Sequence, residues 1–182
     1  MRAFLWSLIV LFLAGCQAGL QSPPGPELVE PATFSHWPGV TKAPIPVGGA
    51  LWGLCRALTP EEVQEQNAAA KAHGPHVAHA VVVRVSPDAV ASFREGKPLP
   101  TGAMVVKEKY SDGLALGPLQ EYAIMIKRQP GYDSDGGDWE YAYVTLVPAR
   151  SVVRGRLGAC ADCHSNANDR DYLFRPYLGA GE

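Results

Sequence analysis

Runs of apolar residues along the chain predict a series of strands. Residues 77–85 form a β-branched run of the kind found in a buried strand. Further strands are predicted over 103–110, 121–127 and 139–147. The segment 129–138 is rich in Pro, Gly and Asp. Such a composition is typical of the connection between neighbouring antiparallel strands.

Helix signals lie on either side of these strands. A helix is predicted over 59–72, where Thr59 and Pro60 are residue types preferred at a helix start. A short helix is predicted over 86–95, with a glycine after it. The chain after residue 148 is predicted to turn helical through 160–164. These elements together predict an α+β fold, in which one antiparallel β-sheet packs with a few helices.

The N-terminus has the pattern of an export signal. Arg2 precedes the apolar run 3–14, which is too short to span a bilayer comfortably. The run ends in Leu-Ala-Gly before Cys16, which resembles a bacterial lipobox. This predicts a lipoprotein signal peptide over residues 1–15 and a lipidated Cys16 as the mature N-terminus. An ordinary signal peptide that contains a cysteine and an uncleaved anchor are the alternatives.

A stretch rich in Pro and Gly follows the predicted lipidation site. Residues 16–48 are interpreted as the lipidated cysteine and a tether that holds a folded domain, residues 49–182, away from a lipid bilayer. The protein is therefore expected to be exported and to face the periplasm. Gln17, rather than Asp, is compatible with sorting to the outer membrane if the host is Gram-negative.

Composition narrows the class of protein. The 182 residues are 47% hydrophobic and carry 16 Lys and Arg against 18 Asp and Glu. The near-neutral balance gives no basic surface for nucleic acid, and the apolar fraction is too high for a disordered chain. The length without residues 1–15 is sufficient to bury a core without disulfides.

The clearest chemical signal is Cys160-Ala161-Asp162-Cys163-His164, the attachment sequence of c-type haem. On one turn of helix two thiols reach the vinyl groups of one porphyrin edge, and the adjacent imidazole binds the iron as axial ligand. The motif predicts one covalent haem c per chain, with Cys160 and Cys163 as attachment residues and His164 as iron ligand. A structural zinc site would need a second ligand pair, and a redox pair would be expected in a βαβ unit.

Four motifs in order make the sequence similar to the cytochrome P460 family over roughly residues 60–178. They are Gly-Ala-Met-Val-Val-Lys-Glu at 102–108, Met-Ile-Lys-Arg with Pro-Gly-Tyr at 125–132, Gly-Asp-Trp-Glu-Tyr-Ala-Tyr at 137–143, and the haem motif at 160–164. The resemblance implies a β-rich haem domain, unlike the helical c-type cytochromes, with its haem-attachment helix near the C-terminus. It also suggests a homodimer.

The resemblance further implies roles for three strand residues. Lys107 takes the place of the lysine that is joined to the porphyrin edge in P460 proper, a cross-link associated with hydroxylamine oxidation. Hydroxylamine-oxidising members also place a carboxylate above the iron as proton acceptor. Ala123 stands at or near that position here, and Glu121 lies two residues earlier on the same strand face. In the cytochrome c′ relatives the haem is not cross-linked and binds gases such as nitric oxide.

Two functional hypotheses follow. In one, the haem oxidises hydroxylamine or a related small nitrogen compound and passes electrons to a soluble cytochrome. In the other, a five-coordinate haem captures nitric oxide or another diatomic gas without turnover. A third possibility, simple electron transfer, needs a sixth ligand, for which Met125 is a candidate, although core filling is the alternative.

Strand alternation bears on the role of Lys107. It places this lysine on one face with Ala103 and Val105, a face that can be buried against haem. From the strand pattern alone, a solvated lysine is the alternative.

The remaining candidates are given structural roles. His73, His76 and His79 recur every three residues, but Gly-Pro interrupts them and an extended strand would separate the last two, so a second metal is not expected. Cys55 is interpreted as a buried thiol. The aromatic residues at 139, 141 and 143 alternate along a strand and predict an aromatic core face.

Overall fold

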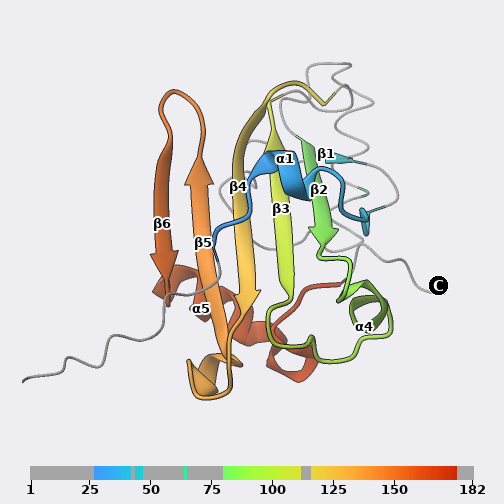
Figure 1. Cartoon of the computed structure of the whole chain (residues 1–182), viewed down its shortest axis with the longest axis vertical. Coiled ribbons are helices and arrows are strands. Elements are labelled where there is room, and N and C mark those ends of the chain that lie inside the picture. The colour runs from blue at the N-terminus through green and yellow to red at the C-terminus, as the bar shows by residue number, and fades with distance from the viewer. Residues whose placement is uncertain (1–26, 42–43, 47–63, 65–79, 112–115, 176–182) are drawn as a thin grey trace, which may run out of the picture.

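The computed structural model describes residues 27–41, 44–46, 64, 80–111 and 116–175. Its centre is a six-stranded sheet in which each strand lies beside the next in the sequence (Figure 1). All neighbouring pairs are antiparallel, so the sheet is a meander. In chain order the strands are β1 Ile45–Pro46, β2 Ala80–Val85, β3 Met104–Tyr110, β4 Leu119–Lys127, β5 Trp139–Thr145 and β6 Ser151–Gly155.

Short helices lie around the sheet and at its lower end (Figure 1). They are α1 Pro31–Phe34, α4 Val90–Arg94 and α5 Gly158–His164, together with the 3₁₀ turns η2 Ser134–Gly136 and η3 Ser165–Arg170. The α+β prediction is confirmed. Among the described residues, no helix is long and apolar enough to cross a membrane.

The two faces of the sheet bury different sets of residues. One face, here called the α5 face, carries the odd-numbered positions of β3 to β5 and packs against α4 and α5; its buried residues include Val83, Val105, Met125, Trp139 and Tyr141. The other face, here called the α1 face, carries the even-numbered positions and packs against α1; its buried residues include Val106, Tyr122, Ile124, Ala142 and Val144. The predicted alternation of β3 and the predicted aromatic face of β5 are therefore confirmed.

Strand register aligns one row of residues across the α5 face. Lys107 of β3 pairs with Val83 on one side and with Ala123 of β4 on the other. Ala123 in turn pairs with Tyr143 of β5. A lysine, an alanine and a tyrosine therefore lie side by side on the face that α5 covers.

The predicted strands agree with the observed ones over the described residues, but the segment after Pro148 does not follow the prediction. It forms the edge strand β6 before α5 begins, and the prediction of helix directly after Pro148 is wrong. Two adjacent valines, Val152 and Val153, are both largely exposed. The strand has no buried face, so it lacks the period-two pattern that would reveal it.

Residues 27–41 pack on the sheet, although they lie within the segment that the sequence predicts to be a tether. Phe34 of α1 is fully buried, and its ring contacts Tyr122 with centroids 5.0 Å apart. Val40 is buried on the α5 face, and its N–H donates to the carbonyl of Val83 at 2.9 Å.

Several sequence predictions lie outside the described residues. These are the signal peptide, Cys16, the thiol of Cys55 and the three histidines at 73, 76 and 79. The helix predicted over 59–72 also lies outside, apart from Gln64, which is helical and exposed. The division into signal peptide, tether and domain stays a prediction.

Candidate functional site

The motif helix α5 begins after Leu157, whose carbonyl accepts hydrogen bonds from the N–H groups of Cys160 and Ala161, both at 2.9 Å. Cys160 and Cys163 are half-buried, and neither forms a disulfide. Residues three apart on a helix lie on the same face, so the two thiols are neighbours. The prediction of a helix over residues 160–164 is confirmed.

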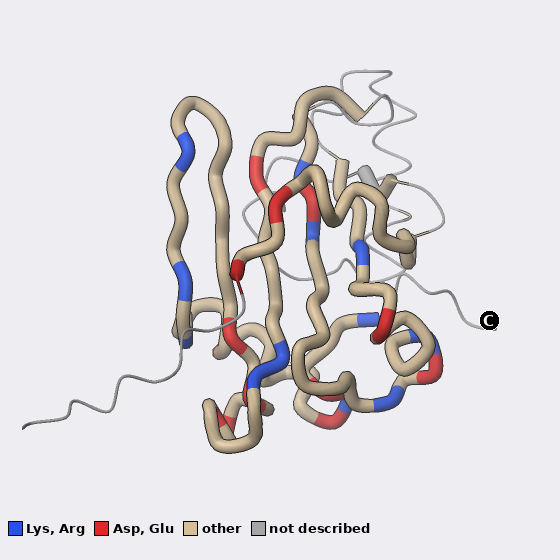
Figure 2. The backbone as a smooth tube through the Cα atoms, in the orientation of Figure 1, with Lys and Arg blue, Asp and Glu red and all other residues tan. Residues whose placement is uncertain are grey.

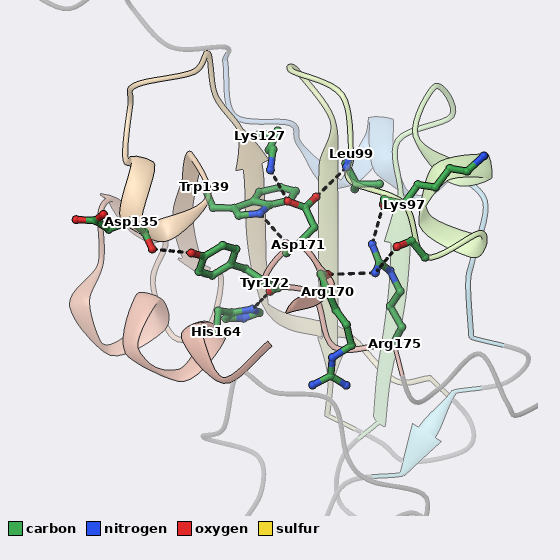
Figure 3. Close-up of polar contacts among 11 residues, drawn as sticks. Lys97, Leu99, Lys127, Asp135, Trp139, His164, Arg170, Asp171, Tyr172 and Arg175 are labelled. Atoms are coloured by element: carbon green, nitrogen blue, oxygen red, sulfur yellow. Dashed lines mark hydrogen bonds and ion pairs between the residues drawn. The ribbon is translucent and has the colours of Figure 1, made fainter. Parts of the chain in front are cut away.

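His164 is the buried residue at the end of this helix. Its ring lies beside those of Tyr141 and Phe174, at centroid distances of 5.5 and 5.2 Å. The Nδ1–H group donates to the carbonyl oxygen of Tyr172 at 2.7 Å (Figure 3). This bond fixes the tautomer and leaves Nε2 as the ring nitrogen that can bind a metal.

Electrostatics favour the neutral imidazole that a metal requires. Burial lowers the pKa of His164 below its ordinary value; the hydrogen bond to Tyr172 opposes this, and the positive charge of Lys107 lowers the pKa further. Lys107 is half-buried and lies near enough to His164 to act on it. The structure thus brings Lys107 and His164 together on the α5 face, although they are far apart in the sequence.

The hydroxyl of Tyr141 shows whether the site has room for a further hydrogen-bonding group. Its hydroxyl is buried and makes no hydrogen bond to any part of the chain that the structure describes. Burial raises the pKa of Tyr141, and the neighbouring thiol of Cys160 raises it further, so the phenol stays protonated. Buried donors are normally satisfied. A buried hydroxyl with no partner among the described residues, beside a Cys-x-x-Cys-His helix, fits a site that a bound haem completes.

Comparison with known protein families identifies the family of this chain. The family model for cytochrome P460 matches residues 59–175, which is more than half of the chain. The chain belongs to the cytochrome P460 family. No curated protein matches the sequence. Family membership makes this a c-type haem cytochrome and implies a covalently bound haem c.

In this P460-family protein, Ala123 is the residue directly opposite Lys107. It is half-buried and lies in the interior strand β4. An alanine at this place brings no proton acceptor, and the prediction that it lies above the iron stays a prediction. Met125, two residues further on the same face, is buried within the apolar cluster that packs against α5.

Glu121 lies on the same face as Ala123, but its carboxylate is already paired. It accepts a hydrogen bond from the hydroxyl of Tyr143 and lies 3.5 Å from the ammonium of Lys109. Lys109 donates to the Tyr143 hydroxyl at 2.9 Å and is itself 1% exposed. These three side chains, here called the Glu121 cluster, form a charged and hydrogen-bonded group next to the row of Lys107 and Ala123.

A second charged group lies on the α1 face. Glu140 is buried and accepts hydrogen bonds from Arg128 and Arg154. A basic position near the end of β6 lies beside an acidic position near the lower end of β5 (Figure 2). Burial raises the pKa of Glu140, but the hydrogen bonds from Arg154 and Arg128 outweigh it, so the net pKa is lowered. This group lies on the opposite face from α5 and joins the edge strand to the sheet.

Sequence reasoning missed several residues around the motif helix. Tyr172 contributes its backbone carbonyl, which accepts the hydrogen bond from His164, and no pattern of side chains predicts such a contact. Strand parity groups Lys109 with Lys107 on one strand and Tyr143 with Tyr141 on another, but the pairing of Lys109 and Tyr143 with Glu121 depends on register across three strands. Among the described residues, no three His, Cys, Asp or Glu side chains gather into a set that would hold a bare metal ion.

Proposed function

We propose that this protein oxidises hydroxylamine or a related small nitrogen compound at one haem c, attached through Cys160 and Cys163 and bound at the iron by His164. The observation that carries the proposal is the place of Lys107. It lies on the face that α5 covers, opposite Ala123, and its charge acts on His164. We propose that this lysine joins the porphyrin edge, the feature associated with hydroxylamine oxidation in P460 proper.

Each residue has a separate task in this proposal. The haem, when bound, supplies the redox centre that takes electrons from the substrate and releases them to a soluble cytochrome. Cys160 and Cys163 hold it to α5, which packs on the sheet. His164 is held in one tautomer by Tyr172 and offers its other ring nitrogen to the iron.

Oxidation of hydroxylamine also releases protons, which need an acceptor near the substrate. Ala123 offers none. Glu121 is the nearest carboxylate along β4 on the same face, and it contacts the hydroxyl of Tyr143, which pairs across the strands with Ala123. We assign Glu121, acting through Tyr143, as the proton acceptor in the oxidative reaction. The ammonium of Lys109 lies 3.5 Å from this carboxylate and forms an ion pair with it.

Capture of nitric oxide or another diatomic gas is the second candidate function. The small side chain of Ala123 favours it, because a gas ligand needs space and no proton acceptor. In this case the haem would not be cross-linked, and Lys107 would remain an amine near the pocket. Simple electron transfer is less well supported, since Met125 lies within the apolar cluster.

The absorption spectrum of the haem-loaded protein distinguishes hydroxylamine oxidation from gas binding. We expect the parent to show a red-shifted ferrous Soret band that persists after denaturation, and Lys107→Arg to lose it while keeping the haem attached. Hydroxylamine turnover should disappear with it. An ordinary high-spin spectrum in the parent, with tight nitric oxide binding and no turnover, would instead establish the gas-binding function. Lys97→Arg is the control, because it makes the same substitution at an exposed lysine, which forms an ion pair with Glu95.

We propose in addition that the protein is exported and lipid-anchored through Cys16, faces the periplasm, and lies in the outer membrane if the host is Gram-negative. Release of the Cys16→Ser variant from membranes is the expected result. Persistent membrane association would indicate that residues 3–14 remain as an uncleaved anchor. A homodimer is proposed from family resemblance, and sedimentation of the haem-loaded protein tests it.

A further inference from the structure

Two consecutive residues in the left-handed conformation follow η3. Asp171 has φ 57° and Tyr172 has φ 59°. This conformation is unfavourable for a residue that has a β-carbon. Two in succession persist where the surrounding contacts determine the backbone. The contacts of these two residues therefore indicate what the local geometry serves.

Asp171 is tied to three separate segments of the domain (Figure 3). Its carboxylate accepts the N–H of Leu99, in the loop after α4, at 2.8 Å. The same carboxylate pairs with the ammonium of Lys127, at the end of β4, at 2.5 Å. Its backbone carbonyl accepts the indole N–H of Trp139, at the start of β5, at 2.9 Å. Both charged side chains are largely buried, so the ion pair is shielded from solvent.

Tyr172 is held just as firmly by its own contacts. Its N–H donates to the carbonyl of Ala167 at 2.8 Å. Its hydroxyl donates to the carbonyl of Asp135 at 2.6 Å, as Figure 3 shows. Its carbonyl is the acceptor for Nδ1–H of His164. The ring lies so close to Gly137 that a β-carbon there would meet it at 2.4 Å. The position of the acceptor for His164 is thus determined by the sheet and its turns.

We propose that Asp171, held by Lys127, is a positioning residue for the axial histidine. It fixes the left-handed backbone that presents the Tyr172 carbonyl to Nδ1 of His164. A carbonyl acceptor at Nδ1 raises the basicity of the imidazole at its other nitrogen. A more basic imidazole binds iron more strongly and favours the ferric state. This inference rests on the proposed function only in taking His164 as the iron ligand.

Three variants separate this role from simple stabilisation. Asp171→Asn keeps a residue that tolerates the left-handed conformation but loses the charge that pairs with Lys127. Lys127→Met removes the partner and leaves Asp171 in place. Lys127→Arg retains a cation and is the conservative variant that should restore the parent properties. Glu108→Gln is the matched control, because Glu108 forms a buried ion pair with Arg84 on the other face of the sheet.

The readouts are the iron–histidine stretching frequency of the ferrous protein by resonance Raman spectroscopy and the midpoint potential of the haem. In Asp171→Asn and Lys127→Met, we expect the frequency to fall and the potential to rise, because the hydrogen bond to His164 weakens. Lys127→Arg should stay near the parent in both. Glu108→Gln should lose thermal stability with neither readout changed.

These measurements distinguish a positioning role of Asp171 from a purely structural one. Unchanged frequency and potential in both Asp171→Asn and Lys127→Met would overturn the proposal and leave Asp171 a structural residue. Equal shifts in Glu108→Gln would also overturn it, since the effect would then be general loosening. If Asp171→Asn fails to fold, the two lysine variants decide alone. A haem spectrum that is the same in His164→Ala as in the parent would refute the axial assignment, and with it both proposals. Absence of hydroxylamine turnover in the parent would contradict the proposed function alone and would leave this inference intact.

Discussion

Phe34 packs its ring against Tyr122 with the two centroids 5.0 Å apart, and both side chains are fully buried. The contact joins α1 to the central strand β4, so residues from the N-terminal side of the sheet contribute to its core. Phe34→Ala removes a large buried ring from a packed cluster. We expect a loss of about 3 kcal/mol in the free energy of unfolding, measured by chemical denaturation. The neighbouring exposed Ser35→Ala should change it by less than about 0.5 kcal/mol. An equal effect of the two would mean that α1 does not pack on the sheet in solution.

Glu140 predicts an acid-sensitive contribution to stability. Its pKa in the folded protein lies below the ordinary value of 4.5, so its stabilising effect is present at neutral pH and is lost as pH falls below that value. Glu140→Gln should cost about 2 kcal/mol at pH 7, and less as the pH decreases. Denaturation curves at a series of pH values measure this. Glu95→Gln, which alters an exposed pair with Lys97, should have little effect at any pH.

Gly137 and Gly96 form a matched pair of positions. Both have positive φ, 65° and 71°, so an alanine at either strains the backbone. A β-carbon at Gly137 would also meet the ring of Tyr172 at 2.4 Å, while one at Gly96 meets nothing within 4 Å. Gly96→Ala is expected to cost about 1 kcal/mol, and Gly137→Ala distinctly more. Gly137→Ala should in addition alter the haem spectrum, because Tyr172 carries the acceptor for His164. Similar stability and spectra for the two variants would contradict this.

The two motif cysteines should contribute separately to haem attachment. Cys163→Ser leaves one thiol, so we expect haem to remain bound covalently but with the pyridine haemochrome spectrum of a single thioether. The double change at Cys160 and Cys163 should abolish covalent attachment, as judged by mass spectrometry of the denatured protein. Cys55→Ser is the control and should retain the parent spectrum. Full attachment in the double variant would remove these cysteines from the site.

Tyr143 tests the proton route. Tyr143→Phe removes the hydroxyl that contacts both Glu121 and Lys109, which should cost about 1 to 2 kcal/mol of stability. If Glu121 accepts protons through this hydroxyl, hydroxylamine turnover should fall while the haem spectrum stays that of the parent. Glu121→Gln should lower turnover similarly, and the double variant should be no slower than either single change. Full turnover in Tyr143→Phe would show that protons leave by another route.

Much of this architecture is visible in the sequence because it depends on local patterns. The ranges of β3, β4 and β5 are predicted from the sequence, and the turn after β4 is predicted from its Gly, Pro and Asp content. Strand parity correctly placed Lys107 with Val105 on one face. The motif helix followed from the spacing of Cys160, Cys163 and His164.

Other features depend on contacts that no local pattern encodes. The strand β6 has exposed valines on successive positions, so neither face is marked as buried. Phe34 lies in a segment rich in Pro and Gly and is buried only because Tyr122 lies opposite it. The left-handed backbone at Asp171 arises from partners 72, 44 and 32 residues away, all brought together by the sheet.

The meander has a consequence for how the protein assembles. From β2 to β6, each strand pairs with the one that precedes it in the chain, so this part of the sheet forms from local contacts, a topology that favours rapid folding. The helix with the cysteine motif comes after the last strand, so it is synthesised when the surface that will receive it is already complete in the chain. The sheet can therefore form before α5 packs on it. Haem attachment can then occur on a chain in which the α5 face has already folded.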